Sequence, residues 1–142
     1  MNSQNEPLGF LLSDIFRLLR QNYQQKVQGV SSLTFAQAKA LLYISREQGL
    51  RQVELAEKLD IKPITLARLI DVLAEANMVE RRPDTKDRRA YLLYLLPDAE
   101  QELAVINRVI IEVRSKAFEH IEKSQHEVVF QYLQTMRDNL AE

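Results

Sequence analysis

Residues 50–96 read LRQVELAEKLDIKPITLARLIDVLAEANMVERRPDTKDRRAYLLYLL, and this stretch decides the fold. It opens with a short predicted helix, in which Leu55 and Leu59 lie one turn apart. The small Ala56 lies beside them, where a second helix can approach closely. Asp60 then falls in a turn position that needs the left-handed backbone region, which Asp tolerates better than most residues.

A second helix is predicted over 63–76. Pro63 suits the first helical position, because the N–H that proline lacks would have no partner there. One apolar stripe at spacings of 3, 4 and 7 is formed by Leu66, Leu69, Ile70 and Leu73. A different face carries Lys62, Thr65, Arg68 and Val72 in place of the Glu/Lys pairs that are typical of a solvated helix. This is the arrangement of a recognition helix in a helix-turn-helix.

The pattern then changes to that of a β-hairpin. Short runs over 78–82 and 90–96 flank a Pro-Asp turn at 83–87. Residues 80–89 hold three acids and five cations, which are Arg81, Arg82, Lys86, Arg88 and Arg89. A helix-turn-helix followed by a basic hairpin is a winged helix-turn-helix, so the predicted fold is mainly α with a small β wing.

Composition limits the possible classes of protein. The 142 residues are 46% hydrophobic, with three Gly and four Pro, which favours one compact helical unit. We expect no membrane span and no signal peptide, because the chain has no long apolar run and begins MNSQNEPLG. With no cysteine, disulfides and thiol-based redox sensing are excluded, and a cytoplasmic location is expected.

Overall charge argues weakly against a nucleic-acid partner, since the net charge is −1 and the pI is about 6.2. The distribution is uneven, however. Residues 97–142 hold five cations and nine acids, whereas the hairpin is basic. Because DNA steering depends on the local field within a Debye length of ~10 Å, a basic wing on a neutral body can bind DNA.

Long amphipathic helices are predicted on both sides of this lobe, over 8–27, 34–48, 98–117 and 124–140. Capping boxes are predicted at Thr34 and at Ser124, each with a Glu or Gln three residues on. The helix predicted over 98–117 carries a heptad seam of Leu103, Ile106, Ile110, Val113 and Ala117. These helices have more apolar surface than one neighbour can bury, so it is covered either within a monomeric bundle or by a second chain.

The lobe resembles that of the MarR/SlyA family of transcription regulators. The resemblance rests on residues 55–95, and most specifically on the wing at 79–95, VERRPDTKDRRAYLLYL. It implies a homodimeric, sequence-specific DNA-binding regulator of a pseudo-palindromic duplex. It also implies a helical dimerisation region, formed by residues 1–32 and 97–142, around a DNA-binding lobe of residues 33–96.

By this resemblance Thr65 and Arg68 face the bases of the major groove, although a solvated helix face is the alternative. Lys62 and Arg51 occupy cap positions where Lys and Arg are poor caps, and we interpret them as phosphate contacts. The expected DNA contacts are Arg51, Lys62, Pro63, Thr65, Arg68, Lys86, Asp87, Arg88 and Arg89.

Within the wing, Arg89 matches the arginine that enters a narrow, A·T-rich minor groove. Asp87 is expected to orient that guanidinium through a bidentate pair. Arg88 is expected to contact DNA or to pair with a helix acid. Arg81, Arg82 and Lys86 either contact phosphates or keep the strand soluble.

The family resemblance also implies a small aromatic or anionic effector, held between the dimerisation helices and the lobe. The candidate residues combine aromatic rings with cations, and they are Phe16, Arg17, Arg20, Tyr23, Tyr43 and Arg46. Ordinary core and helix-end packing is the alternative role for the same side chains.

Enzyme chemistry finds little support in the sequence. His120 and His126 lie six residues apart across a predicted helix break, which is not a metal-ligand spacing on one helix face. There is no Gly-rich phosphate loop and no nucleophile elbow. We therefore expect no catalysis, no metal and no cofactor. A winged-helix module that binds proteins, or a ligand carrier that binds no DNA, remain the alternatives from other classes.

Overall fold

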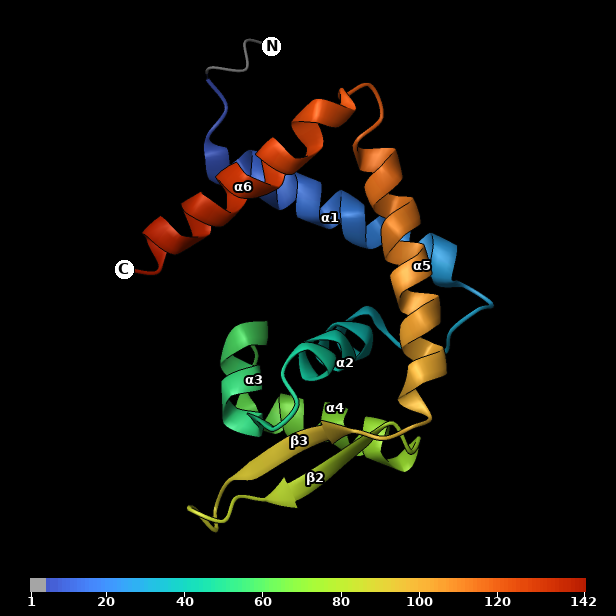
Figure 1. Cartoon of the computed structure of the whole chain (residues 1–142), viewed down its shortest axis with the longest axis vertical. Helices are drawn as coiled ribbons and strands as arrows, with labels where there is room; N and C mark the ends of the chain where they lie inside the picture. Colours follow the sequence, from blue (N-terminus) through green and yellow to red (C-terminus); the bar gives the residue numbers. More distant parts are fainter. Residues whose placement is uncertain (1–4) are drawn as a thin grey trace.

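The computed structural model describes residues 5–142 (Figure 1). Its helices and strands are α1 (Leu8–Val27), α2 (Phe35–Arg46), β1 (Leu50–Arg51), α3 (Gln52–Leu59), α4 (Pro63–Glu75), β2 (Val79–Pro83), β3 (Tyr91–Leu95), α5 (Ala99–Ala117) and α6 (Lys123–Leu140). In Figure 1, α2, α3, α4 and the sheet form one end of the molecule, and α5 leads from this end to α1 and α6 at the other.

The turn between α3 and α4 has the predicted backbone. Asp60 lies in the left-handed region with φ 52° and ψ 47°, and its N–H donates to the carbonyls of Ala56 and Glu57 at the end of α3. Pro63 begins α4, with Lys62 at the cap position. Ala56 is buried, as its small side chain predicted. The helix-turn-helix is therefore confirmed.

The sheet has three strands, in the order β1-β3-β2, and the two-stranded hairpin predicted from the sequence was incomplete. Both pairings are antiparallel, and β1 joins through Leu50 opposite Leu93 and Arg51 opposite Leu92. A strand of two residues is too short to produce an alternating pattern, so no sequence pattern indicated it. The completed sheet is the wing of a winged helix fold.

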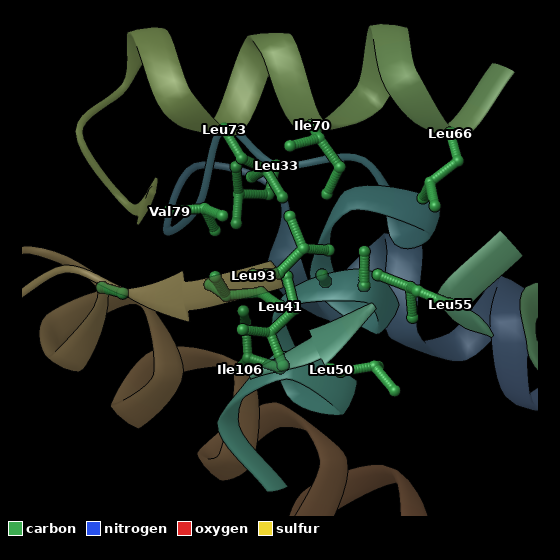
Figure 2. Close-up of a cluster of buried hydrophobic side chains, with 14 of the residues drawn as sticks. Leu33, Leu41, Leu50, Leu55, Leu66, Ile70, Leu73, Val79, Leu93 and Ile106 are labelled. Carbon is green, nitrogen blue, oxygen red and sulfur yellow. The ribbon is translucent and has the colours of Figure 1, made fainter. Parts of the chain in front are cut away.

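The core joins the lobe to α5 (Figure 2). Leu41 from α2, Leu55 from α3 and Leu93 from β3 are fully buried together with Ile106 from α5. The apolar stripe of α4 contributes Leu66, Ile70 and Leu73, all with no exposed surface. Each such side chain stabilises the fold by about 1.5–3 kcal/mol through removal from water, so this cluster fixes where the exposed face of α4 points.

The seam of α5 differs from the predicted heptad. Ile106, Val109 and Val113 are buried, whereas Ile110 is 36% exposed and Ala117 lies at the surface. The helix turns its Val109 side toward α1 and the lobe, because a helix packed against a globular body follows a 3.6-residue period. Ile110 is left on a separate apolar face.

A large apolar surface is exposed on α1 and α6. No residue of α6 is buried. The six most exposed large hydrophobic side chains on these two helices are Leu8, Phe10, Phe16, Leu18, Tyr132 and Leu140. None of the helices within residues 5–142 combines the length and apolarity that crossing a membrane requires.

One predicted cap is confirmed and one is wrong. The N–H of Gln37 donates to Thr34 Oγ1 at 3.1 Å and the N–H of Thr34 donates to Gln37 Oε1 at 3.0 Å, which is the predicted capping box. Ser124 caps nothing, because α6 begins one residue earlier, with Glu122 at the cap position and no side-chain cap bond.

Candidate nucleic-acid interface

The outer face of α4 is held outward by the buried stripe on its other side. Lys62, Thr65 and Arg68 are all exposed, as the sequence predicted. Within residues 5–142 neither Lys62 nor Arg68 makes an ion pair, so their charges face solvent. Pro63 is also exposed, at the first turn of the helix. These four side chains form one surface at the N-terminal end of α4.

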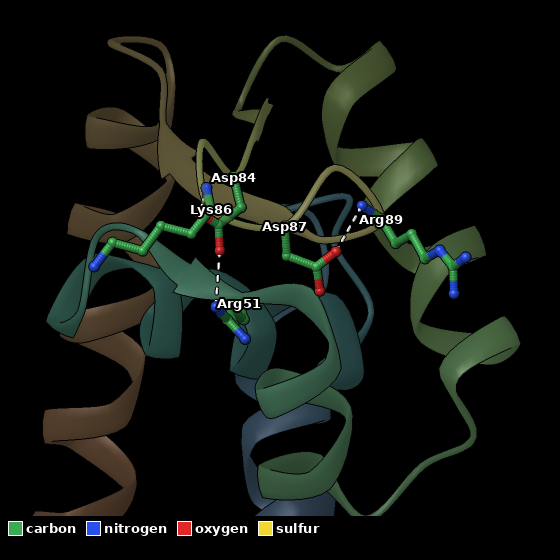
Figure 3. Close-up of polar contacts among 5 residues, drawn as sticks. All are labelled: Arg51, Asp84, Lys86, Asp87 and Arg89. Atoms are coloured by element: carbon green, nitrogen blue, oxygen red, sulfur yellow. Dashed lines mark hydrogen bonds and ion pairs between the residues drawn. The ribbon is translucent and has the colours of Figure 1, made fainter.

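The base of the wing is fixed by Asp84, which is only 8% exposed. Arg51 Nη2 donates to Asp84 Oδ2 at 2.9 Å, and the backbone N–H of Lys86 donates to Asp84 Oδ1 at 2.9 Å (Figure 3). The Lys86 N–H bond, together with the charge of Arg51, lowers the pKa of Asp84 despite the opposing effect of burial. One nitrogen of the Arg51 guanidinium is therefore bonded to the wing, and the Arg51 side chain is still 41% exposed.

Asp87 acts on the backbone, which differs from the predicted bidentate pair. Its Oδ1 accepts the backbone N–H of Arg89 at 3.0 Å, and the Arg89 guanidinium extends away from Asp87 (Figure 3). Asp side chains commonly accept the N–H two residues on, which is why this local bond competes with the guanidinium. Asp87 thus shapes the loop, and the Arg89 charge remains exposed.

Arg88 and the Lys86 side chain are also exposed at the loop. Arg88 makes no ion pair with any described residue, so the expected pairing with a helix acid is absent from residues 5–142. The loop therefore presents three cations, Lys86, Arg88 and Arg89, whose charges are not neutralised by side chains within the described range.

Arg81 has a role that neither sequence interpretation anticipated. Its Nε donates to Gln52 Oε1 at 2.8 Å, its Nη1 to Asp71 Oδ1 at 2.6 Å, and its Nη2 to the Ala67 carbonyl at 2.8 Å. One guanidinium thus joins β2 to α3 and α4. The partners are 10 to 29 residues away, so no local pattern could have shown this.

Arg82 contacts two side chains of the sheet. Its guanidinium lies 4.0 Å from the centre of the Tyr94 ring and 3.3 Å from Glu80 Oε2. These two contacts hold the side chain along the sheet, on the neighbouring strand β3 and on β2 itself. Arg81 and Arg82, which the sequence treated alike, are therefore both engaged within the protein.

A recess of about 250 Å³ brings the predicted contacts together between the wing and the helix-turn-helix. Its lining residues come from β1, α3, α4 and the hairpin, and they are Arg51, Gln52, Val53, Pro63, Asp87, Arg89, Ala90 and Tyr91. Four of the residues predicted to contact DNA thus border one depression. Thr65 and Arg68 lie outside it, on the exposed face of α4.

The predicted effector residues are only partly assembled. Phe16 and Tyr23 meet the ring of Phe35 edge-on, with centroids 5.9 and 5.6 Å away, and the Arg20 guanidinium lies 5.4 Å from the same ring. Phe35 was missed, although its place at the start of α2 makes it the centre of this cluster. Burial and nearby Glu102 raise the pKa of Tyr23, whose hydroxyl has no hydrogen-bond partner among residues 5–142.

The other effector candidates lie apart from this cluster. Arg17 is exposed and contacts Asp14 at 3.5 Å. Tyr43 and Arg46 lie on α2, where Tyr43 is half-buried and Arg46 is exposed, and no contact joins either to the Phe35 ring. Within the described range there is no group of three or more His, Asp or Glu side chains placed to hold a metal ion.

Comparison with known proteins gives consistent matches. Residues 33–91 match the sequence model of the MarR family. The chain is 31% identical over 97 residues to the HTH-type transcriptional repressor MdtR of Bacillus subtilis (strain 168), an alignment that covers 63% of this chain and 62% of that repressor. The match thus spans less than two thirds of the repressor's length.

Solved structures match over almost the whole chain. The crystal structure of MarR superposes with a TM-score of 0.88 at 28% identity, covering 99% of this chain and 95% of that one. The transcriptional repressor CouR, solved bound to a 23-mer DNA duplex, superposes with a TM-score of 0.79 over 96% of each chain. At 23% identity, the CouR likeness supports the fold alone.

Proposed function

This chain belongs to the MarR family, and from that premise we propose that it is a homodimeric, sequence-specific DNA-binding regulator of transcription. The observation that carries the proposal is a pair of surfaces whose exposed cations make no ion pair within residues 5–142. Lys62 and Arg68 lie on α4, and Lys86, Arg88 and Arg89 lie on the wing loop. Both surfaces belong to the same winged lobe.

In the proposed complex α4 enters the major groove. Thr65 and Arg68 contact base edges, and Lys62 at the start of the helix contacts a phosphate. Arg89 enters the adjacent minor groove from the tip of the wing, where a narrow A·T-rich segment attracts it. Arg51, Lys86 and Arg88 contact the backbone on either side. CouR, which has the same fold, was solved with a DNA duplex.

We propose that α1, α5 and α6, within residues 1–32 and 97–142, form the dimer, and that residues 33–96 form the DNA-binding lobe. The support is the apolar surface on α1 and α6. Helix α6 has 18 residues and no buried side chain, so packing within its own chain stabilises it little. Its Val, Phe, Leu and Met side chains, none of which is buried, indicate a surface that a partner covers. A second copy would bury both helices and place two lobes on a pseudo-palindromic site.

An effector site is proposed around the ring of Phe35, with Phe16, Arg20 and Tyr23. The aromatic edges and the Arg20 charge suit an aromatic anion. The buried Tyr23 hydroxyl, which lacks a partner within residues 5–142, is a hydrogen-bond donor available to such a ligand. Because the cluster joins α1 to α2, binding there would change how the dimer helices hold the lobes and hence the affinity for DNA.

Selection of bound duplexes from a random pool at low salt tests the proposal. The expected product is an enriched site with two similar halves about one helical turn apart. The affinity for that site should fall steeply as salt rises, because cations that contact phosphates release counterions. If no duplex is retained in dilute buffer, the chain does not bind DNA, and a protein-binding winged helix is then the better account.

A further inference from the structure

Ile64 is a large apolar side chain in an unexpected place. It is the second residue of α4 and is 63% exposed, although Leu66, Ile70 and Leu73 of the same helix are completely buried. At about 100° per residue, Ile64 lies roughly 200° around the helix from Leu66, on the side that faces away from the core. Burial in the core of residues 5–142 therefore does not explain why this position holds an isoleucine.

The neighbours of Ile64 define the surroundings of this side chain. Arg68 follows one turn later on the same face, and Thr65 and Lys62 flank it, all exposed. Further along the same face the charge reverses at Asp71 and Glu75. The N-terminal half of the face is therefore apolar and cationic, and only that half complements a polyanion.

Three protein-internal roles for Ile64 fail. It is not a core residue, because more than half of its surface is exposed. It is not part of a hydrophobic staple, since with Lys62 at the cap position that contact would join Ile61 to Leu66. It does not belong to the apolar surfaces of α1 and α6, because its helix, α4, lies at the opposite end of the molecule from these two helices (Figure 1).

We propose that Ile64 is a specificity-determining residue that contacts the C5-methyl group of one thymine in each half-site. The inference rests on the proposed function, and it adds an apolar base contact to the hydrogen bonds proposed for Thr65 and Arg68. In the major groove the thymine methyl is the one apolar group on a base edge, and aliphatic side chains recognise it by contact. Arg68 and Thr65 would supply hydrogen bonds to neighbouring bases, and Ile64 would favour thymine over cytosine at its own position.

Replacing thymine by uracil tests the contact directly, because uracil lacks only the methyl and keeps the same hydrogen-bond groups. Each thymine of the selected duplex is replaced in turn, symmetrically in both halves, and the affinity is measured for the wild-type protein and for Ile64→Ala. At one position per half-site we expect uracil to weaken wild-type binding about three- to fivefold per methyl, the effect of removing one buried carbon. Ile64→Ala should bind the thymine and uracil duplexes equally at that position.

Val53→Ala is the matched control. Val53 is another exposed aliphatic residue, 51% exposed, but it lies on α3 beside the recess. This variant should keep the wild-type loss on the uracil duplex. Ile64→Val, which retains a branched aliphatic side chain, should keep most of it. Because Ile64 is at the surface, its removal should leave the far-ultraviolet circular dichroism unchanged, and that measurement verifies the fold.

Two results would overturn the inference, and they are distinguishable. If the wild-type protein binds its selected duplex but no thymine-to-uracil change separates it from Ile64→Ala, then Ile64 does not read a methyl group and the proposed function stands. If neither protein binds any duplex, the proposed function fails and the role of Ile64 fails with it.

Discussion

Arg81 Nη1 on β2 lies 2.6 Å from Asp71 Oδ1 on α4, and this ion pair ties the wing to α4. The Arg81 side chain is 24% exposed, so the pair is partly shielded from water. Its other two donors reach Gln52 and the Ala67 carbonyl. One guanidinium therefore joins β2 of the wing to both α3 and α4.

Arg81→Ala should destabilise the protein by about 2–3 kcal/mol, because hydrogen bonds that involve charged groups contribute about 1.5–3 kcal/mol. Urea denaturation measures the change. Arg82→Ala is the control, since Arg82 is 52% exposed and its ion pair stays on one strand. It should cost less than about 1 kcal/mol, in line with surface pairs. Equal stabilities for the wild type and Arg81→Ala would contradict the role of Arg81 as a clamp.

Asp84 should make stability depend on acid. Folding lowers the pKa of Asp84 below the ordinary value of 3.8, so the stabilisation is complete above that value. It disappears as pH falls through the lower, folded-state pKa. Asp84→Asn should be less stable at neutral pH and should lose this part of the acid dependence. Denaturation between about pH 2 and pH 6 measures both effects.

Asp138→Asn provides the matched control for Asp84, because Asp138 lies at the exposed end of α6 beside Arg137. This variant should reproduce the wild-type pH profile. An Asp84→Asn profile parallel to that of the wild type over the whole acid range would show that Asp84 does not anchor the wing.

Arg89→Ala should reduce DNA affinity about tenfold, in the range expected for the loss of one groove-reading arginine. The loss should be largest on A·T-rich flanks, where the narrow minor groove has the more negative potential. Binding to duplexes that differ only in their flanks measures this. Arg137→Ala, which removes a remote exposed arginine, should bind as the wild type does. The same loss on G·C-rich flanks would place Arg89 outside the minor groove.

Leu133→Glu should dissociate the proposed dimer. Leu133 is 41% exposed on α6, and a carboxylate there would be buried against a second copy. Sedimentation equilibrium should give the mass of one chain for this variant. Gln131→Glu adds the same charge at an exposed polar position of α6 and should remain dimeric. A dimeric Leu133→Glu would move the interface away from this face of α6.

Features that depend on a few neighbouring residues were predictable from the sequence. The Thr34 capping box, the left-handed Asp60 and Pro63 at the start of α4 all follow from local chemistry. The apolar stripe of α4 was also predicted, and with it the exposed positions of Thr65 and Arg68. Local patterns therefore placed most of the lobe.

Features that depend on distant partners were not predictable. Strand β1 is defined only by its pairing with β3, about 40 residues later. Arg51 and Asp84 are 33 residues apart, and Arg81 reaches back to Gln52 across 29. The expected ion pair between the Asp87 carboxylate and the Arg89 guanidinium does not form, because Asp87 instead accepts a local hydrogen bond from the Arg89 backbone N–H. The sequence showed that the wing is basic. It did not show which of the wing arginines bond within the protein and which are exposed to solvent.

The mass of the complex with a selected duplex tests the central claim most directly. Sedimentation of the wild-type protein with that duplex at low salt should give two chains per duplex, and raising the salt should release both together. A single chain per duplex, or a protein that sediments as one chain beside free DNA, would contradict the account.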